Sequence, residues 1–187
     1  MELEHNCFYH IFNRSNNDEV VFKESENYSY FLNKYVHYTI GFVDTLAYCL
    51  MPTHFHFLVH IKTKEVETVK NNIGLLLSSY TKAINVRFKR HGSLFQQHTK
   101  AKIVQYEEYL ATTVMYIHQN PVRSKLVQRL EDWEFSSYCD YVDLRKNSFV
   151  RSGDVLGMFP SLEEFMRQSQ YSVDSVQMDS TYNAMAR

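Results

Sequence analysis

The sequence has little of what disordered, fibrous or membrane-embedded chains need. Only 5 glycines and 3 prolines occur among 187 residues, which excludes a collagen-like, linker-rich or low-complexity protein. No apolar run approaches the roughly 20 residues of a membrane-spanning helix. The first ten residues lack the basic and apolar regions of a signal peptide. We therefore expect a globular cytoplasmic protein with no membrane partner.

Cysteine is also scarce, and the three cysteines lie far apart, at Cys7, Cys49 and Cys139. An odd number without a C-x-x-C pair fits neither a disulfide framework nor a structural zinc site. This spacing again favours a reducing compartment.

Acidic residues are absent from the middle of the chain between Glu67 and Glu107. Residues 68–130 carry 10 Lys and Arg against 2 acids, whereas residues 1–67 carry 9 acids against 5 bases and residues 131–187 carry 10 against 5. A basic centre of this kind indicates a surface that meets a polyanion such as a nucleic acid. The alternative is a solvated helix face whose charges pair with the acidic ends.

The hydrophobic pattern predicts alternating strands and helices. Strands are expected over 6–13, 42–50, 54–61 and 100–105, and helices over 24–38, 65–91 and 106–119, with the last helix stopped by Asn120-Pro121. The order β-α-β-β-α-β predicts an α+β, ferredoxin-like antiparallel sheet with helices on one face. The last helix and a C-terminal extension add to it. We expect a catalytic domain over 1–130 and an extension over 131–187, peripheral beyond residue 143.

The first candidate site is HFHFLVH, residues 54–60. Alternate side chains of a strand share a face, so Phe55 and Phe57 point toward the core and His54 and His56 away from it. Two imidazoles at this spacing can reach one metal ion. The alternative is a half-exposed strand that carries histidines by chance. In either case the pair needs a third ligand from elsewhere.

The second candidate site is MYIHQNPVR, residues 115–123. Tyr116 and Asn120 are four residues apart and can share a helix face. The alternative places Tyr116 in the core and leaves Asn120 as a helix stop. Combined with a cation, a phenol is an apt nucleophile for phosphodiesters, because the metal stabilises charge that develops in the transition state.

Five segments together resemble the single-tyrosine HUH transposases, and among them the REP-associated tyrosine transposases. They are FYHIFNRSNN (8–17), LMPTHFHFLVH (50–60), GSLFQQ (92–97), YIHQNPVRSKLV (116–127) and WEFSSY (133–138). The resemblance implies a ferredoxin-like fold and metal-dependent cleavage and rejoining of single-stranded DNA near hairpins, through a 5′-phosphotyrosine. It makes Tyr116 the nucleophile, and His54, His56 and Asn120 the metal ligands. Thr53 departs from the family pattern, which has Asn there.

The implied cofactor is a divalent cation, Mg²⁺ or Mn²⁺, and two imidazoles tilt the site toward Mn²⁺. The implied partner is single-stranded or hairpin DNA, which would make the protein nucleoid-associated when bound. The resemblance leaves both a monomer and a homodimer open. Basic residues expected to contact the DNA are Arg14, Lys82, Arg87, Lys89, Arg90, Lys100, Lys102, Arg123 and Lys125.

Two other functions remain open at this point. The same sheet fold serves non-catalytic nucleic-acid-binding modules, whose strand aromatics stack bases. A metal-dependent phosphoesterase would hydrolyse small substrates without forming a covalent protein adduct.

Overall fold

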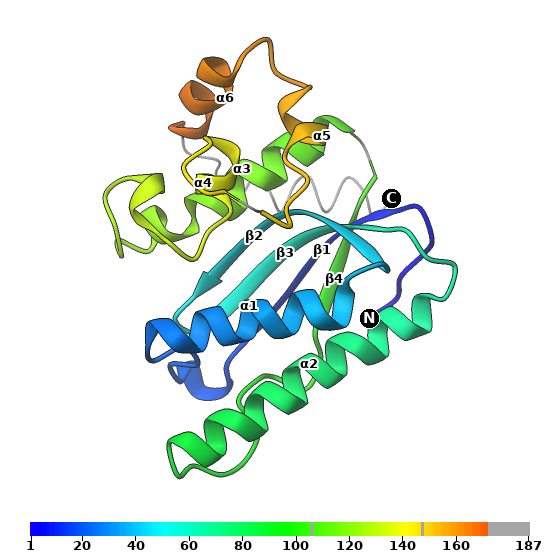
Figure 1. Cartoon of the computed structure of the whole chain (residues 1–187), viewed down its shortest axis with the longest axis vertical. Helices are drawn as coiled ribbons and strands as arrows, with labels where there is room; N and C mark the ends of the chain where they lie inside the picture. Colours follow the sequence, from blue (N-terminus) through cyan, green and yellow to red (C-terminus); the bar gives the residue numbers. More distant parts are fainter. Residues whose placement is uncertain (106, 147, 172–187) are drawn as a thin grey trace.

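The protein, described by a computed structural model over residues 1–105, 107–146 and 148–171, is built on a four-stranded sheet. Its first elements are β1 (Phe8–Arg14), a short 3-10 turn η1 (Asn16–Asp18), α1 (Ser25–Thr39), β2 (Val43–Met51), β3 (His54–Ile61), α2 (Val66–Arg87) and β4 (Lys100–Val104). The strands lie in the order β2-β3-β1-β4, and every neighbouring pair is antiparallel (Figure 1). The predicted ferredoxin-like α+β fold is confirmed.

The turn between β2 and β3 is as short as the sequence predicts. Met51 pairs with His54, so the hairpin closes over Pro52 and Thr53 alone. Because Pro fixes φ and cannot donate to a ladder, the break falls at this point and sets the register of the histidines that follow.

Helices α1 and α2 cover one face of the sheet. Their apolar positions recur at helical spacing, and Phe31 of α1 and Tyr80 of α2 are fully buried. Alternate residues of β3 meet them; the ring of Phe57, for example, stacks on Tyr35 at 3.8 Å between centroids. This layer is the main core and holds β3 rigidly from one side.

The opposite face is covered by the second half of the chain (Figure 1). Its elements are α3 (Glu107–Arg123), η2 (Leu130–Asp132), α4 (Tyr138–Tyr141), α5 (Gly153–Leu156) and α6 (Leu162–Ser169). Leu58 of β3 is fully buried there, in a second core that includes Val114 and Ile117 of α3. The one-sided helix layer predicted for the sheet therefore describes α1 and α2, while α3 and the C-terminal elements form another layer. Tyr106, where the predicted last helix begins, and residues 172–187 lie outside the described residues.

Helix α3 does not stop at Asn120-Pro121, and that prediction was wrong. The helix continues through Pro121 to Arg123. A proline lacks the N–H that would bond the carbonyl four residues earlier, here Ile117. The Asn120 amide nitrogen donates to the carbonyls of Tyr116 (2.9 Å) and Ile117 (3.3 Å), and so supplies the missing donor.

The C-terminal segment anchors α3 on the side away from the sheet. His118 Nε2 lies 2.8 Å from Ser137 Oγ, and Gln119 Nε2 donates to the carbonyls of Ser169 (2.9 Å) and Tyr171 (2.6 Å). Phe165 of α6 is fully buried in the same layer. The helix is thus fixed both by packing and by hydrogen bonds to residues that follow it.

His118 makes the stability of the protein depend on pH. Burial lowers its pKa from 6.5 to about 3, so between these values the unfolded state binds a proton that the folded state does not. We expect the free energy of unfolding to fall with decreasing pH below 6.5, with His118 contributing up to about 1.4 kcal/mol per pH unit. Urea unfolding between pH 7 and pH 4.5, with a chelator present, measures the slope. In His118→Gln the slope should be shallower by that amount; an equal slope would contradict the assignment.

Within the described residues, each helix is either too short or too polar to cross a bilayer.

Candidate metal and tyrosine site

Strand β3 places His54 and His56 on the face that looks toward α3. Phe55 and Phe57 point into the main core, and the intervening histidines point the other way, as the strand period requires. The two imidazole rings lie 5.1 Å apart between centroids and are perpendicular. The pair is therefore oriented to converge on a common point beside the sheet.

Helix α3 brings Tyr116 and Asn120 to the same place. The Tyr116 ring lies 6.1 Å from the His56 ring, edge to face. Tyr116 is only partly buried, so it is not enclosed in the core. His54, His56, Tyr116 and Asn120 all line one pocket of about 280 Å³, which we call the histidine pocket. Residues from β1 and from 96–100 complete its wall: Phe12, Asn13, Arg14, Gln96, His98 and Lys100.

Both histidines are held neutral. Burial, followed by the charge of Arg14, lowers the pKa of His54 to about 4. Burial, followed by His10 and His54, holds the pKa of His56 well below its usual value. A neutral imidazole offers a lone pair, which is the form that binds metal. Both side chains can therefore act as ligands at neutral pH without first losing a proton.

His10 of β1 is a site residue that the sequence reasoning missed. Its Nε2 lies 2.9 Å from Nδ1 of His56, and both side chains are buried. The two residues are diagonal neighbours, because Phe12 pairs with His56 and His10 with Leu58 across β1 and β3. Strand alternation alone places His10 on the face opposite Tyr9 and Ile11, but only the register between two distant strands places it beside His56.

The free nitrogens fit a metal ligand set. His56 Nε2 is buried and has no hydrogen-bond partner in the described part of the chain. His54 Nδ1 lies 3.1 Å from the Thr53 hydroxyl, which leaves Nε2 as its ligand atom. The Asn120 nitrogen is engaged by the helix carbonyls, so its oxygen is the atom left to face a cation. Two imidazoles and an amide oxygen make a donor set suited to Mn²⁺ or Mg²⁺.

No group of three or more His, Cys, Asp or Glu side chains within the described ranges is arranged to hold a metal by itself. The protein therefore offers a partial coordination sphere.

The basic residues predicted to contact DNA do not form one surface. Three arginines are paired with acids from the N-terminal part of the chain: Arg14 with Asp18, Arg87 with Glu24 and Arg90 with Glu19. Lys100 lines the histidine pocket, and its Nζ lies 5.9 Å from the centre of the Phe12 ring. Lys102 lies next to Ala101 and Ile103 on β4.

Two further basic residues lie at the end of α3. The Arg123 guanidinium lies over the Tyr116 ring, 5.1 Å from its centroid. Lys125 lies in the turn that follows, with a positive φ of 57°. Lys82 and Lys89 line a separate cavity beside α2.

Comparisons with known proteins agree with the motifs. No family model matches the chain. A curated relative from Haemophilus influenzae, described as a putative REP-associated tyrosine transposase, is 24% identical over 104 residues, which cover 51% of this chain and 58% of the relative. The chain thus aligns with little more than half of that protein's length. A solved structure of a REP-associated tyrosine transposase bound to a REP hairpin matches with a TM-score of 0.63 and 16% identity, covering 83% of this chain and 90% of the other. The resemblance to REP-associated tyrosine transposases that the motifs indicate is confirmed in sequence by the first protein, and the second shows that the fold is shared.

Proposed function

We propose that this protein is a metal-dependent transposase-type endonuclease that cuts and rejoins single-stranded DNA near hairpins through Tyr116. The observation that carries the proposal is the convergence of a partly exposed tyrosine, two neutral histidines and an amide oxygen in one pocket. These groups come from β3 and α3, elements more than fifty residues apart. The relatives named above are a transposase and a transposase bound to hairpin DNA, which supports DNA of this kind as the substrate.

In the proposed reaction the Tyr116 oxygen attacks a backbone phosphorus. A bond forms between Tyr116 Oη and phosphorus while the bond from phosphorus to O3′ breaks, and the O3′ leaves with the electron pair and takes up a proton. The products are a 5′-phosphotyrosine and a free 3′-hydroxyl. Because the covalent link retains the energy of the phosphodiester, a second 3′-hydroxyl can reverse the step and rejoin a strand.

His54, His56 and Asn120 would hold the divalent cation in the histidine pocket. When bound, the cation polarises the phosphate and stabilises the charge of the transition state. Arg123, stacked on the Tyr116 ring, places a second positive charge next to the nucleophile. Lys100 adds a cationic contact for the phosphate backbone at the pocket wall.

The structure favours an enzyme over a base-stacking module. Such modules need open aromatic side chains on the sheet face. Here α3 and the C-terminal elements cover that face, so that Leu58 is fully buried and His56 is 7% exposed. We retain residues 1–130 as the catalytic domain and 131–187 as an extension, and we assign the extension's described part the task of fixing α3.

The function is tested with a labelled hairpin oligonucleotide that carries single-stranded flanks, incubated with the protein and Mn²⁺. We expect a covalent protein–DNA species on a denaturing gel that disappears when EDTA replaces Mn²⁺. Hydrolysis of small phosphodiesters without any adduct would instead identify a phosphoesterase.

His10 should act as a positioning residue for His56. For His56 Nε2 to bind a metal, its proton must lie on Nδ1 and be donated to His10 Nε2. His10→Ala should weaken Mn²⁺ binding by about 10–100-fold, the usual effect of losing an outer partner of a ligand. His10→Gln should restore much of it, because its side-chain oxygen can accept the same proton. Calorimetry of Mn²⁺ binding and thermal unfolding are measured on both variants.

His60→Ala provides the matched control for these variants. His60 lies on the same strand and bonds Asn6, away from the pocket, so its loss should leave Mn²⁺ affinity unchanged. Equal affinity in His10→Ala and the wild type would remove His10 from this role.

A further inference from the structure

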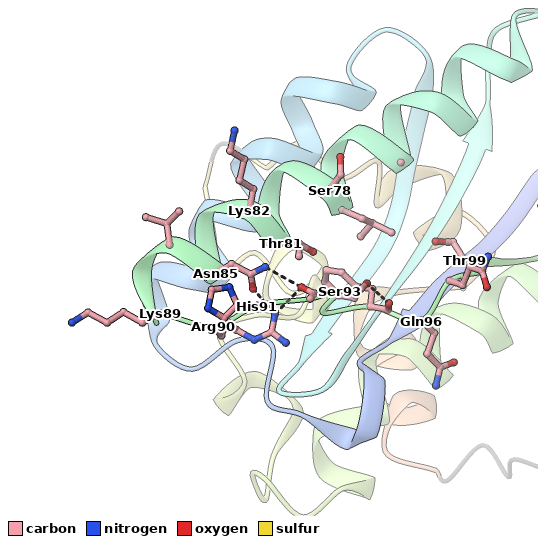
Figure 2. A pocket seen from close by; sticks show the side chains of 16 residues that line it. Ser78, Thr81, Lys82, Asn85, Lys89, Arg90, His91, Ser93, Gln96 and Thr99 are labelled. Atoms are coloured by element: carbon pink, nitrogen blue, oxygen red, sulfur yellow. Dashed lines mark hydrogen bonds between the residues drawn. The ribbon is translucent and has the colours of Figure 1, made fainter.

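The largest cavity of the protein lies beside the histidine pocket. It has a volume of about 1010 Å³ and runs between the second half of α2 and the segment 89–99 (Figure 2). Volumes of about 300–1,000 Å³ are typical of sites that enclose small ligands. The cavity, which we call the α2 groove, is therefore large enough for a ligand of several connected units.

The walls of the α2 groove are fixed by an internal hydrogen-bond network. Arg90 makes a two-pronged ion pair with Glu19 (3.0 and 2.8 Å) and also donates to Asn85 Oδ1 (2.5 Å). Asn85 Nδ2 in turn donates to the carbonyl of Gly92 (2.9 Å). On the other side, Asn13 Nδ2 donates to Gln96 O (3.1 Å) and Thr99 Oγ1 (3.0 Å). The groove is thus formed before any ligand arrives.

The groove is positively charged. Its described lining residues include no carboxylate. The charge of Arg90 is neutralised by Glu19, but neither Lys82 nor Lys89 takes part in an ion pair within the described part of the chain. Leu77 and Phe95 add apolar surface, and Ser78 and Thr81 add hydroxyl groups. Cationic groups beside apolar surface are the combination that single-stranded nucleic acids recognise.

The groove and the histidine pocket share a wall. Residues 96–100 alternate between them: His98 and Lys100 line the histidine pocket, Gln97 and Thr99 line the groove, and Gln96 lines both. Figure 2 shows Gln96 and Thr99 at one end of the groove and Lys82 and Lys89 at the other. A strand that passes Gln96 on leaving the histidine pocket would therefore reach the two lysines last.

We infer that the α2 groove binds the single-stranded DNA that flanks the cleavage site, with its phosphates at Lys82 and Lys89 and its bases against the apolar and amide-bearing wall. This rests on the proposed function, because it is the histidine pocket that would hold the scissile phosphate. Gln97 is the residue placed to contact base edges, since a glutamine amide can both donate and accept a hydrogen bond.

The test measures DNA binding by fluorescence anisotropy in EDTA, where no cleavage occurs. One probe is a bare hairpin, and two others carry a mixed-sequence flank of about six nucleotides on the 5′ or the 3′ side, within the ~4–16 that single-strand sites cover. In Lys82→Gln/Lys89→Gln, the slope of log K against log salt should fall by about 1.4 for at least one flanked probe, or about 0.7 per lost phosphate contact. The slope for the bare hairpin should not change.

Lys64→Gln/Lys70→Gln is the matched control, because it removes the same charge before and at the start of α2, outside the groove. It should leave the flanked-probe slope at its wild-type value. Gly74→Glu is a second, fold-safe variant: a Cβ at this groove residue meets nothing within 4 Å, and Glu is a better helix former than Gly. Its added negative charge should weaken binding of the flanked probe alone.

The outcomes separate the two proposals. Wild-type protein that binds hairpins but gains nothing from either flank, or groove and control variants with equal slopes, would overturn the groove and leave Tyr116 chemistry standing. Wild-type protein that binds none of the probes would overturn both. Normal flank binding without any covalent adduct in Mn²⁺ would support the groove and contradict the cleavage reaction.

Discussion

Tyr116→Phe should abolish the covalent protein–DNA species while leaving hairpin binding intact. The substitution removes one oxygen atom and keeps the ring that contacts His56 and Arg123. Without that oxygen no bond to phosphorus can form, and loss of a covalent nucleophile typically lowers a rate by on the order of 10⁴-fold or more. The measurement is adduct yield on a denaturing gel with Mn²⁺, beside anisotropy binding in EDTA.

Tyr109→Phe is the control for this variant. Tyr109 lies on the same helix and packs, partly buried, against the second core. It should form adduct at the wild-type rate. An adduct that persists in Tyr116→Phe would show that another side chain attacks the phosphate, and a loss of hairpin binding in that variant would show that Tyr116 serves recognition instead.

His56→Ala should have the second-largest effect, because it removes both a ligand atom and the partner of His10. We expect Mn²⁺ affinity to fall by more than ~100-fold, the upper range for loss of an outer partner, and cleavage to fall with it. DNA binding in EDTA should not change, since the proposed contacts to DNA lie elsewhere. Calorimetric titration with Mn²⁺ measures the affinity directly.

The buried position of His56 requires a check on folding in that variant. Circular dichroism and the unfolding temperature establish whether the sheet is retained, and His54→Ala repeats the test at the more exposed ligand, where less packing is lost. Wild-type Mn²⁺ affinity in both folded variants would rule out the histidine pair as the metal site.

The parts of the site that are local in sequence could be predicted well. His54 and His56 share a face because a strand repeats every two residues, and Tyr116 and Asn120 share one because a helix repeats every 3.6. The predicted end of α3 failed for a physical reason: the side chain of Asn120 replaces the backbone donor that Pro121 lacks. Propensity rules describe the backbone, and here a side chain compensates for it.

Features that depend on tertiary pairing could not be predicted. His10 reaches His56 only through the register of β1 against β3, which no local pattern reveals. The charge pattern along the chain is real, but the fold brings Glu19 and Glu24 next to Arg90 and Arg87. Those arginines are thereby occupied in holding the structure together, whereas Lys82 and Lys89 retain their charge at the groove.

The bonds from α3 to Ser137, Ser169 and Tyr171 have a consequence for how many chains one reaction needs. A tyrosine-bearing helix that is to be exchanged between two copies must first come loose from its own fold. Here, exchange would break three side-chain bonds and expose Phe165 to water. The nucleophile and the histidines that it faces therefore work in cis, and a single copy of the chain contains a whole reaction centre.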